Sequence, residues 1–433
     1  MCRGGGAGVE VLGVEQPRGH PEDRGDDGRD GHGVTPSALS VVVVSTGRPE
    51  ALHRCLLALS QLRRAGCEVV VVADRAGRHA VQDFAGRIKL LPQDIPNISA
   101  ARNAGIASSS GQIVAFIDDD AVPEPTWGDA IVQAFTQPGI AAVTGPVLGR
   151  NGIGLQWGPQ AVNGQVDEVE TEPATPFRDG FVRKLHGTNM AFRRAVFDQI
   201  GGFDEAMHFY LDDTDMALRI GHAGLPTAWI EAAIVHHGFQ ASVRRTADRV
   251  PTSLHDIGSS TRVFLRKHAG EADHARAVRR LEAAQSSRLL RLAKTKALDA
   301  EKMRALMESL RAGLDEGRDR ESLAPRITAC GDRFQPFCAS DPPKPLVLSG
   351  RPFQRMRLHR VAADAVGAGQ PVTLFIFEPT PRKHRVRFTD GGWWEHSGGL
   401  FGPADRTESR IQLHSFRGRV SREVCRISAM RGL

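Results

Sequence analysis

The chain has 433 residues, which is too long for one compact hydrophobic core, so two or three domains are expected. Its 41% hydrophobic and 24% charged residues are typical of a soluble globular protein. No apolar run approaches the roughly 20 residues that span a bilayer, and the N-terminus does not resemble a signal peptide, so a cytoplasmic protein is expected. A net charge of +6 suits small anionic ligands or an anionic membrane face. No nucleic-acid-binding motif is present, so nucleic acid is not an expected partner.

Composition divides the chain into four parts. Residues 1–36 are rich in Gly, Arg, Asp and Glu without apolar periodicity, which predicts a disordered tail. Residues 37–268 alternate strand and helix patterns, and residues 269–330 have the helical spacing of an amphipathic segment. Residues 331–433 begin with a Pro-rich linker and continue as a small unit. We therefore expect a main α/β domain, a helical segment and a small C-terminal α/β accessory unit.

The main domain starts with a strand, a helix and a second strand. Residues 40–44 have the composition of a strand buried on both faces, and Leu52, Leu56, Leu59 and Leu62 mark the core face of a helix. Residues 68–73 form the next strand pattern. This succession predicts a mostly parallel sheet with right-handed crossovers. No G-x-G-x-x-G follows the first strand, so a dinucleotide-binding site is not expected.

The stretch Ile113–Ala121 is an apolar, β-branched run that ends in Asp118, Asp119 and Asp120. Because side chains alternate along a strand, Asp118 and Asp120 are expected on one side and Asp119 on the other. Ligands bind at the carboxyl ends of strands in open α/β sheets, and hard cations prefer oxygen ligands. This D-x-D pattern is therefore a candidate site for Mg²⁺ or Mn²⁺ carrying a phosphorylated ligand, although an Asp triplet taken alone fits a solvated turn better.

Four segments follow one another in a specific order. They are Thr46-x-Arg48-Pro49, Ala101-Arg102-Asn103-x-Gly105 leading into Phe116–Asp120, Asn189 to Phe203 with Gly201-Gly202-Phe203, and Asp212-Asp213-x-Asp215. Each is weak alone, but in this order and spacing they resemble the inverting family 2 glycosyltransferases of the GT-A fold. The resemblance implies a mostly parallel sheet flanked by helices, and transfer of a sugar from a nucleotide-sugar donor to a hydroxyl acceptor.

The resemblance also assigns roles to individual residues. Asp74, at a strand end, would hydrogen-bond the nucleotide base, and Asp118 would contact the nucleoside. Asp120 would ligate a divalent metal, Mn²⁺ or Mg²⁺, that neutralises charge on the leaving diphosphate. Asp213 would be the general base that takes the proton from the acceptor hydroxyl. The other donor-site candidates come from the same segments: Thr46, Arg48, Arg102, Asn103, Asp119 and Asn189.

Alternatives remain open at the two acidic sites. The family usually has Glu-Asp at the base motif, and the shorter Asp212 here leaves open which carboxylate reaches the acceptor. Asp74 also fits a turn former, and Asp213 a helix-cap acid. The two acids beside Asp213 would raise its pKa, which favours its role as base.

Histidine and arginine residues follow the main motifs. His236 stands where the family often has a histidine, sometimes a third metal ligand, but a structural hydrogen bond fits as well, and His237 adjoins it. Arg262 and Arg266 resemble the basic cluster that grips the diphosphate, although a solvated basic helix face is nearly as good an account. On charge alone, a loop with Arg244, Arg245 and Arg249 could close over the donor.

The expected partners are a UDP-sugar and a glycan or lipid-linked acceptor in polysaccharide or glycoconjugate synthesis. The basic helices after residue 268 could rest on an anionic membrane surface, but an ordinary packed helix is the commoner case. A sugar nucleotidyltransferase is the first alternative, disfavoured because residues 45–49 lack the glycines of its phosphate loop. A non-catalytic glycan-binding or scaffold protein on the same fold is the second, disfavoured because both acidic motifs keep their carboxylates.

Overall fold

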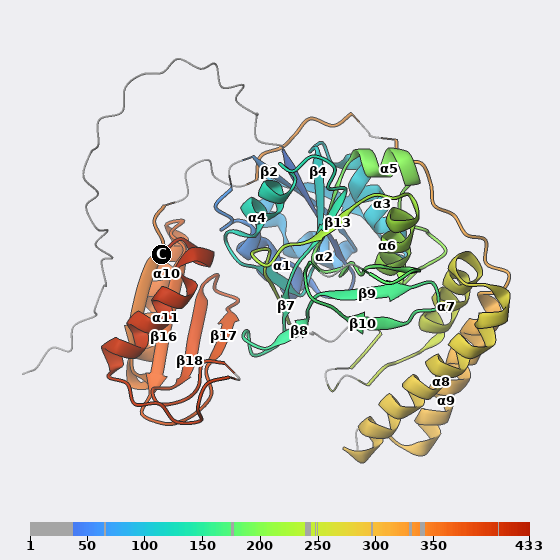
Figure 1. The fold of residues 1–433 in the computed structure, drawn as a ribbon. Coiled ribbons are helices and arrows are strands. Elements are labelled where there is room, and N and C mark those ends of the chain that lie inside the picture. Colours follow the sequence, from blue (N-terminus) through green and yellow to red (C-terminus); the bar gives the residue numbers. More distant parts are fainter. Residues whose placement is uncertain are drawn as a thin grey trace, which may run out of the picture. The chain divides into compact units, whose positions relative to one another are not determined.

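The computed structural model describes residues 38–433, apart from residues 65, 175–176, 239–243, 247, 249, 296–297, 329–330, 338–342 and 406 (Figure 1). The expected disordered tail, residues 1–36, lies outside the described residues. The described chain forms two compact units, residues 38–342 and residues 343–433.

The first unit is built around a seven-stranded sheet in the order β13-β6-β12-β4-β1-β2-β3. Strand β12 is antiparallel to its neighbours β4 and β6, and the other neighbouring pairs are parallel. The strands are β1 (Leu39–Ser45), β2 (Cys67–Ala73), β3 (Lys89–Pro92), β4 (Ile113–Asp118), β6 (Ala142–Thr144), β12 (Met190–Arg193) and β13 (Thr227–Trp229). This mostly parallel sheet confirms the predicted fold class.

Helices cover both faces of this sheet, which explains why its central strands are apolar throughout. One face, with Val41 and Val43 of β1, packs against α1 and α4, and the other, with Val42, packs against α3, α5 and α6 (Figure 1). These helices and the short α2 are α1 (Pro49–Leu59), α2 (Arg75–Ala80), α3 (Ile98–Ser108), α4 (Trp127–Ala134), α5 (Ala195–Ile200) and α6 (Asp212–His222).

Two small sheets complete the first unit near the ends of the central strands. Their strand orders are β5-β14-β7-β8 and β10-β9-β11. The strands are β5 (Ala121–Pro123), β7 (Val147–Leu148), β8 (Leu155–Trp157), β9 (Gln160–Asn163), β10 (Glu168–Glu170), β11 (Phe181–Arg183) and β14 (Val235–His237). Residues 149–180, whose Gly, Pro and Gln content predicts a loop region, therefore contain three short strands. Strands of three or four residues are too short to leave a readable alternation.

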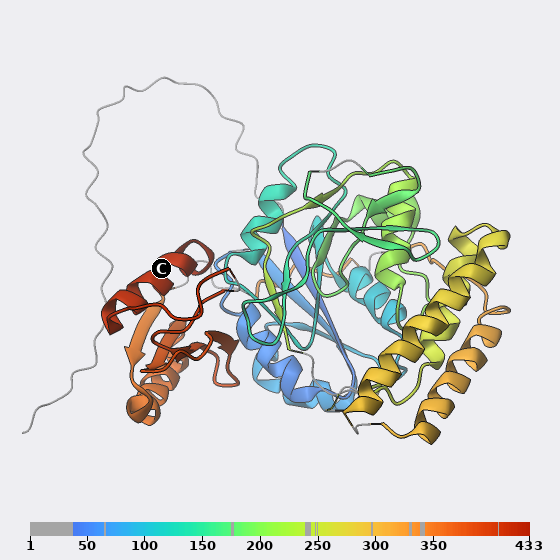
Figure 2. The same cartoon turned by 60° about the horizontal axis from the view of Figure 1, so that its bottom comes forward.

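The first unit ends in three helices, α7 (His255–His268), α8 (Glu271–Lys294) and α9 (Ala300–Glu316). Helices α8 and α9 lie side by side in both views (Figures 1 and 2) and share an apolar cluster with the residues before α7. The expected helical segment is thus present. None of the described helices combines the length and apolar composition needed to cross a bilayer.

The second unit has a four-stranded sheet in the order β15-β16-β18-β17. Its elements are β15 (Leu346–Gly350), α10 (Arg355–Gly367), β16 (Val372–Glu378), β17 (Arg385–Phe388), β18 (Trp394–Gly399) and α11 (Phe416–Arg431). Helix α10 packs on one face of the sheet and α11 on the other. The sequence did not predict α11, because three of its buried side chains are the charged Arg419, Glu423 and Arg431.

Candidate active site

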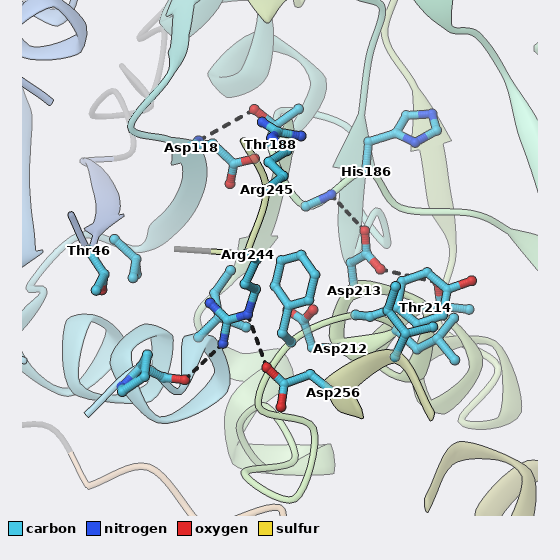
Figure 3. A pocket seen from close by; sticks show the side chains of 18 of the residues that line it. Thr46, Asp118, His186, Thr188, Asp212, Asp213, Thr214, Arg244, Arg245 and Asp256 are labelled. Atoms are coloured by element: carbon cyan, nitrogen blue, oxygen red, sulfur yellow. Dashed lines mark hydrogen bonds and ion pairs between the residues drawn. The ribbon is translucent and has the colours of Figure 1, made fainter. Parts of the chain in front are cut away.

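A cavity of about 570 Å³ lies in the first unit, at the carboxyl ends of β1 and β4 (Figure 3). Seven of the residues predicted for the site line it: Thr46, Arg48, Arg102, Asp118, Asp120, Asp212 and Asp213. Segments far apart in the sequence therefore meet in one space, at the edge of the sheet where ligands of α/β proteins bind.

The acidic triplet follows the alternation expected from the sequence. Asp118 and Asp120 line the cavity, whereas Asp119 is fully buried and accepts a 2.7 Å hydrogen bond from the Ser45 hydroxyl. Burial raises the pKa of Asp119 to about 7, although the charge of Arg48 opposes this rise. The Arg48 guanidinium bridges the two acids, with Nη2 2.6 Å from Oδ1 of Asp119 and Nη1 2.9 Å from Oδ2 of Asp120.

One ligating atom each from Asp118, Asp120 and His237 lies within 4.8 Å of the other two. Nε2 of His237 is 3.2 Å from Oδ1 of Asp120. Strand β14 pairs with β5 directly after the triplet, and this pairing brings His237 to the site. His236, the neighbouring position on the strand, lies 2.8 Å from Glu124 Oε1 instead. Two carboxylates and an imidazole form a donor set that fits a divalent cation such as Mn²⁺.

The two acids of the base motif differ in their partners. Asp212 begins α6 and forms a buried ion pair with Arg102. Burial raises the pKa of Asp212 to about 6, and the Arg102 charge opposes the rise. Asp213 instead accepts hydrogen bonds from the Gly187 N–H (2.8 Å) and the Thr214 hydroxyl (3.1 Å). Among the described contacts Asp213 therefore meets neutral donors, whereas Asp212 meets a cation.

The loop before α6 has a strained backbone. Tyr210 and Leu211 have φ values of 79° and 66°, in the left-handed region that residues with a Cβ seldom adopt. Both residues line the cavity directly before the two acids. The strained turn thus lies where α6 presents Asp212 and Asp213 to the cavity.

The third acid of the motif, Asp215, is buried in an ion-pair network. Burial alone would raise the pKa of Asp215, but the hydrogen bond from His268 and the charges of Arg219 and Lys267 outweigh it and lower this pKa. Oδ1 of Asp215 lies 2.8 Å from Nζ of Lys267, and Oδ2 lies 2.8 Å from Nε of Arg219. Asp215 therefore holds α6 against α7.

Three other predicted residues, Asp74, Asn103 and Asn189, are not among those that line the cavity. Both oxygens of Asp74 accept 2.7 Å hydrogen bonds, from the N–H groups of Gly47 and Gly77, so Asp74 caps α2 and anchors the turn after β1. Asn103 hydrogen-bonds both backbone groups of Phe203. Asn189 accepts from the Trp127 indole and donates to two backbone carbonyls.

Arg262 and Arg266 do not line the cavity. Arg262 donates to the carbonyl of Leu314 (3.3 Å), and Arg266 donates to the carbonyl of Gly317 (3.2 Å), at the end of α9. Their hydrogen bonds with carbonyls at this helix end are favoured by the helix dipole. The structure thus brings these two arginines to α9 and leaves them outside the group around Asp120.

Several cavity residues had no clear signal in the sequence. Trp157 stacks on His186, with ring centroids 5.7 Å apart at 17°, and also contacts His237 at 5.5 Å. Burial lowers the pKa of His186 to about 4, so this ring is neutral at physiological pH. Arg245, named in the sequence on charge alone, lies 3.3 Å from Asp120, whereas Arg249 is outside the described residues.

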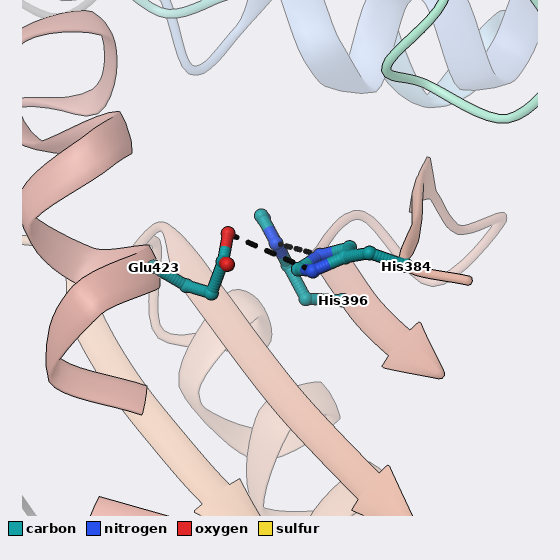
Figure 4. A group of neighbouring side chains, drawn as sticks. All are labelled: His384, His396 and Glu423. Carbon is teal, nitrogen blue, oxygen red and sulfur yellow. Dashed lines mark hydrogen bonds and ion pairs between the residues drawn. The ribbon is translucent and has the colours of Figure 1, made fainter. Parts of the chain in front are cut away.

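The second unit holds another buried group, His384, His396 and Glu423 (Figure 4). Nη1 of Arg431 lies 2.7 Å from Nε2 of His396, and because a guanidinium only donates, that nitrogen accepts. Nη2 of Arg419 lies 3.2 Å from Nδ1 of His384, and Nε2 of His384 lies 2.9 Å from Nδ1 of His396. Glu423 pairs with Arg419 and Arg426. Three arginines therefore place positive charge around this group, which disfavours a bound cation.

Parts of the chain are similar to known proteins. Residues 36–250 match the family model described as "Glycosyltransferase like family 2". A pre-mycofactocin glycosyltransferase of Mycobacterium tuberculosis is 27% identical over 217 residues, which are 48% of this chain and 44% of the relative. An N-acetylglucosaminyl-diphospho-decaprenol L-rhamnosyltransferase of the same species is 26% identical over 270 residues, 54% of this chain and 85% of the relative. A mannosyltransferase structure from Pyrobaculum calidifontis aligns with a TM-score of 0.38 and 16% identity over 66% of this chain and 88% of its own.

The fold and the family match define the class of the protein. A mostly parallel sheet flanked by helices carries a cavity, lined by acidic and basic side chains, at the carboxyl ends of its strands. The residues matched by the family model contain both acidic motifs. Residues 36–250 therefore form a domain that belongs to the family 2 glycosyltransferases, a family of transferase enzymes. The chain spans about half the length of the first relative that it matches.

Proposed function

We propose that the cavity of the first unit transfers a sugar from a nucleotide-sugar donor to a hydroxyl group of an acceptor, with inversion at the anomeric carbon. The observation that carries this proposal is that Asp213 lines the same cavity as Asp118 and Asp120. A candidate base for the acceptor and a candidate metal-binding group for the donor therefore surround one space.

Asp213 is the general base of this proposal. The acceptor oxygen forms a bond with the anomeric carbon, and the bond from that carbon to the diphosphate oxygen breaks. The proton of the hydroxyl goes to Asp213, and the nucleoside diphosphate leaves with the electron pair. The hydrogen bonds from Gly187 and Thr214 orient the Asp213 carboxylate for this step. A single displacement of this kind inverts the anomeric configuration.

Asp118, Asp120 and His237 would hold the divalent ion, Mn²⁺ or Mg²⁺. Bound there, the ion would supply positive charge to the leaving diphosphate. Arg48 and Arg245 both contact Asp120, and their guanidinium groups can form charged hydrogen bonds with phosphate oxygens. These two arginines are therefore proposed to bind the diphosphate of the donor.

The donor and acceptor are proposed from chemistry and from the names of relatives. We propose that the donor is a UDP-sugar. Its base would donate a hydrogen bond to an Asp74 oxygen, which has a lone pair left in addition to the one that accepts from a backbone N–H. The rhamnosyltransferase relative is named for a diphospho-decaprenol compound, which supports a glycan or lipid-linked acceptor. A cytoplasmic location and contact with an anionic membrane stay predictions, and salt-sensitive sedimentation with anionic liposomes tests the membrane contact.

A thermal-shift panel tests the proposed function. The melting temperature of the full chain is measured with UDP-, GDP- and dTDP-sugars, with and without Mn²⁺. At least one donor is expected to raise the melting temperature, more strongly with Mn²⁺, because a ligand that binds the native state stabilises it. No shift with any donor contradicts the proposal. The anomeric configuration of the product, read by NMR, tests inversion, and retention would contradict it.

A further inference from the structure

Six arginine and lysine side chains line the cavity of the first unit, and five of them have an acidic partner. The pairs are Arg48 with Asp119 and Asp120, Arg102 with Asp212, Lys184 with Glu168, Arg244 with Asp256, and Arg245 with Asp120. Arg288 is the sixth, and the described residues place no carboxylate within 4.0 Å of it. Its Nη1 lies 3.4 Å from Oε1 of Gln285 on the same helix.

The guanidinium of Arg288 is partly withdrawn from water. The side chain is half-buried at the cavity, and burial lowers the pKa of Arg288. Desolvating a charged group without a counter-charge costs free energy. An anion that enters the cavity would remove this cost and gain a charged, bidentate hydrogen-bond partner.

Arg288 and the candidate base Asp213 line the same cavity, together with Tyr210. Burial and the negative charges of Glu168 and Asp213 raise the pKa of Tyr210 to about 12, whereas the charge of Arg288 opposes the rise. Tyr210 thus has Asp213 and Arg288 among its charged neighbours. Arg48 and Arg245 instead contact Asp120, in the part of the cavity proposed to bind the diphosphate of the donor.

The position of Arg288 in the sequence supports a role in substrate choice. The family model matches residues 36–250, whereas α8, which carries Gln285 and Arg288, spans Glu271–Lys294. This wall of the cavity is therefore added to the family-matched domain by a segment that follows it.

We propose that Arg288 binds an oxyanion of the acceptor substrate, a phosphate or carboxylate group carried near the hydroxyl that receives the sugar. This inference rests on the proposed function, because it names the acceptor class of the same cavity. Arg288 is a specificity-determining residue in this account and takes no part in the proton transfer.

Binding of three probes to the full chain tests the inference. The probes are octyl glucoside (neutral), octyl glucuronide (carboxylate) and N-acetylglucosaminyl diphosphate linked to a phenoxyundecyl chain (diphosphate), each titrated calorimetrically at fixed salt. The wild-type chain is expected to prefer one of the two anionic probes, and the preferred one identifies the source of the oxyanion. Arg288→Gln is expected to weaken that probe about 10- to 100-fold and the neutral probe about twofold or less.

Arg291→Gln is the matched control, because Arg291 is on the same helix, is exposed and does not line the cavity. It is expected to bind all probes as the wild type does. Arg288→Lys keeps the charge and is expected to retain most of the preference, and Arg288→Met, which also removes the charge, replaces Arg288→Gln if that variant does not fold. The inference is overturned if the wild type prefers neither anionic probe, or if Arg288→Gln weakens neutral and anionic probes equally. All of these outcomes are measured as binding affinities. Failure of this inference can therefore be distinguished from failure of the proposed sugar transfer, which is measured as product formation.

Discussion

The carboxylate of Asp213 accepts a 2.8 Å hydrogen bond from the backbone N–H of Gly187. A Cβ at position 187 would lie 3.3 Å from this carboxylate and 2.9 Å from the Arg102 guanidinium, so glycine leaves both groups in place. Asp212 is held differently, by its ion pair with Arg102. Adjacent acids thus have different environments, and this difference supports Asp213 as the base.

Asp213→Asn is expected to lower the rate of sugar transfer by about 10²- to 10⁴-fold, because the amide cannot accept the proton. The amide oxygen can still accept the hydrogen bond from the Gly187 N–H, and the amide NH2 group can donate to the Thr214 hydroxyl, which then accepts. The melting temperature and donor affinity are therefore expected to change little. Initial rates, thermal melts and donor titrations measure these three quantities. A variant that turns over at the wild-type rate would remove Asp213 from the mechanism.

Asp212→Asn is the matched comparison. This variant removes the nearer of the two carboxylates that pair with the buried Arg102 and leaves Asp118, whose Oδ1 is 3.7 Å from Nη2. The free energy of unfolding is therefore expected to fall by about 1.5–3 kcal/mol. Denaturant unfolding of both Asn variants measures the contrast. Equal stability losses in the two variants would contradict the assignment of a structural ion pair to Asp212 and of the base to Asp213.

His237→Ala is expected to raise the Mn²⁺ concentration needed for half-maximal activity at least about tenfold, because it removes the imidazole beside Asp120. His236→Ala is the control from the neighbouring position. It leaves the buried Glu124 without its histidine partner, so it is expected to lower stability by about 1–3 kcal/mol and to leave the metal dependence unchanged. Titrations of activity with Mn²⁺ measure the metal dependence of both variants. The assignment of His237 as a metal ligand is refuted if His236→Ala raises the required Mn²⁺ concentration and His237→Ala does not.

Gly202→Ala is expected to destabilise the chain by about 1–3 kcal/mol. The added Cβ would lie 2.4 Å from Oδ1 of Asn103, whose side chain is held by Phe203, and 2.6 Å from Ile327. Gly149→Ala is the control, because its nearest neighbours would be at ordinary contact distances of 3.6 and 3.8 Å. Denaturant midpoints of the two variants are compared, and an unchanged midpoint for Gly202→Ala counts against the tight contact.

The second unit is expected to lose stability in mild acid. Burial, followed by the charges of Arg426, Arg419 and Arg431, lowers the pKa of His384 well below its usual 6.5 in the folded chain. Glu423 and His396 also face it. The unfolded chain therefore binds a proton that the folded chain does not, so stability is present above pH 6.5 and is lost as the pH falls below that value.

Hydrogen exchange of β16 and β18, corrected for intrinsic rates and followed from pH 7.5 to 5.5, measures this loss. His384→Gln, which does not titrate, is expected to give a flatter profile. A wild-type profile with no decline below pH 6.5, or the same decline in the variant, contradicts the role of His384.

The main fold could be predicted from the sequence because its central strands are buried on both faces. Runs such as residues 40–44 and 113–117 are apolar without interruption, and their helices show apolar residues at helical spacing. The short strands β8 to β10 lack such a pattern. Helix α11 was missed for another reason, since its buried face carries the charged Arg419 and Glu423, which pair at 3.4 Å, and so lacks a continuous apolar pattern.

The candidate site was predictable where alternation along a strand decides the direction of a side chain. It assigned Asp118 and Asp120 to one side and Asp119 to the other. His236 and His237 are neighbours on a strand, so they point to opposite faces of it. Which of the two lies beside Asp120 depends on the pairing of β14 with β5. The role of Arg288 could not be predicted, because it depends on how α8 lies against the cavity.

The most direct test of the central claim measures the release of nucleoside diphosphate from a panel of nucleotide-sugars. The wild type and Asp120→Ala are each measured with Mn²⁺ and with EDTA. The account predicts release from at least one donor with Mn²⁺, and loss of that release with EDTA and in a folded Asp120→Ala variant. Equal release from that donor in all of these conditions would contradict it.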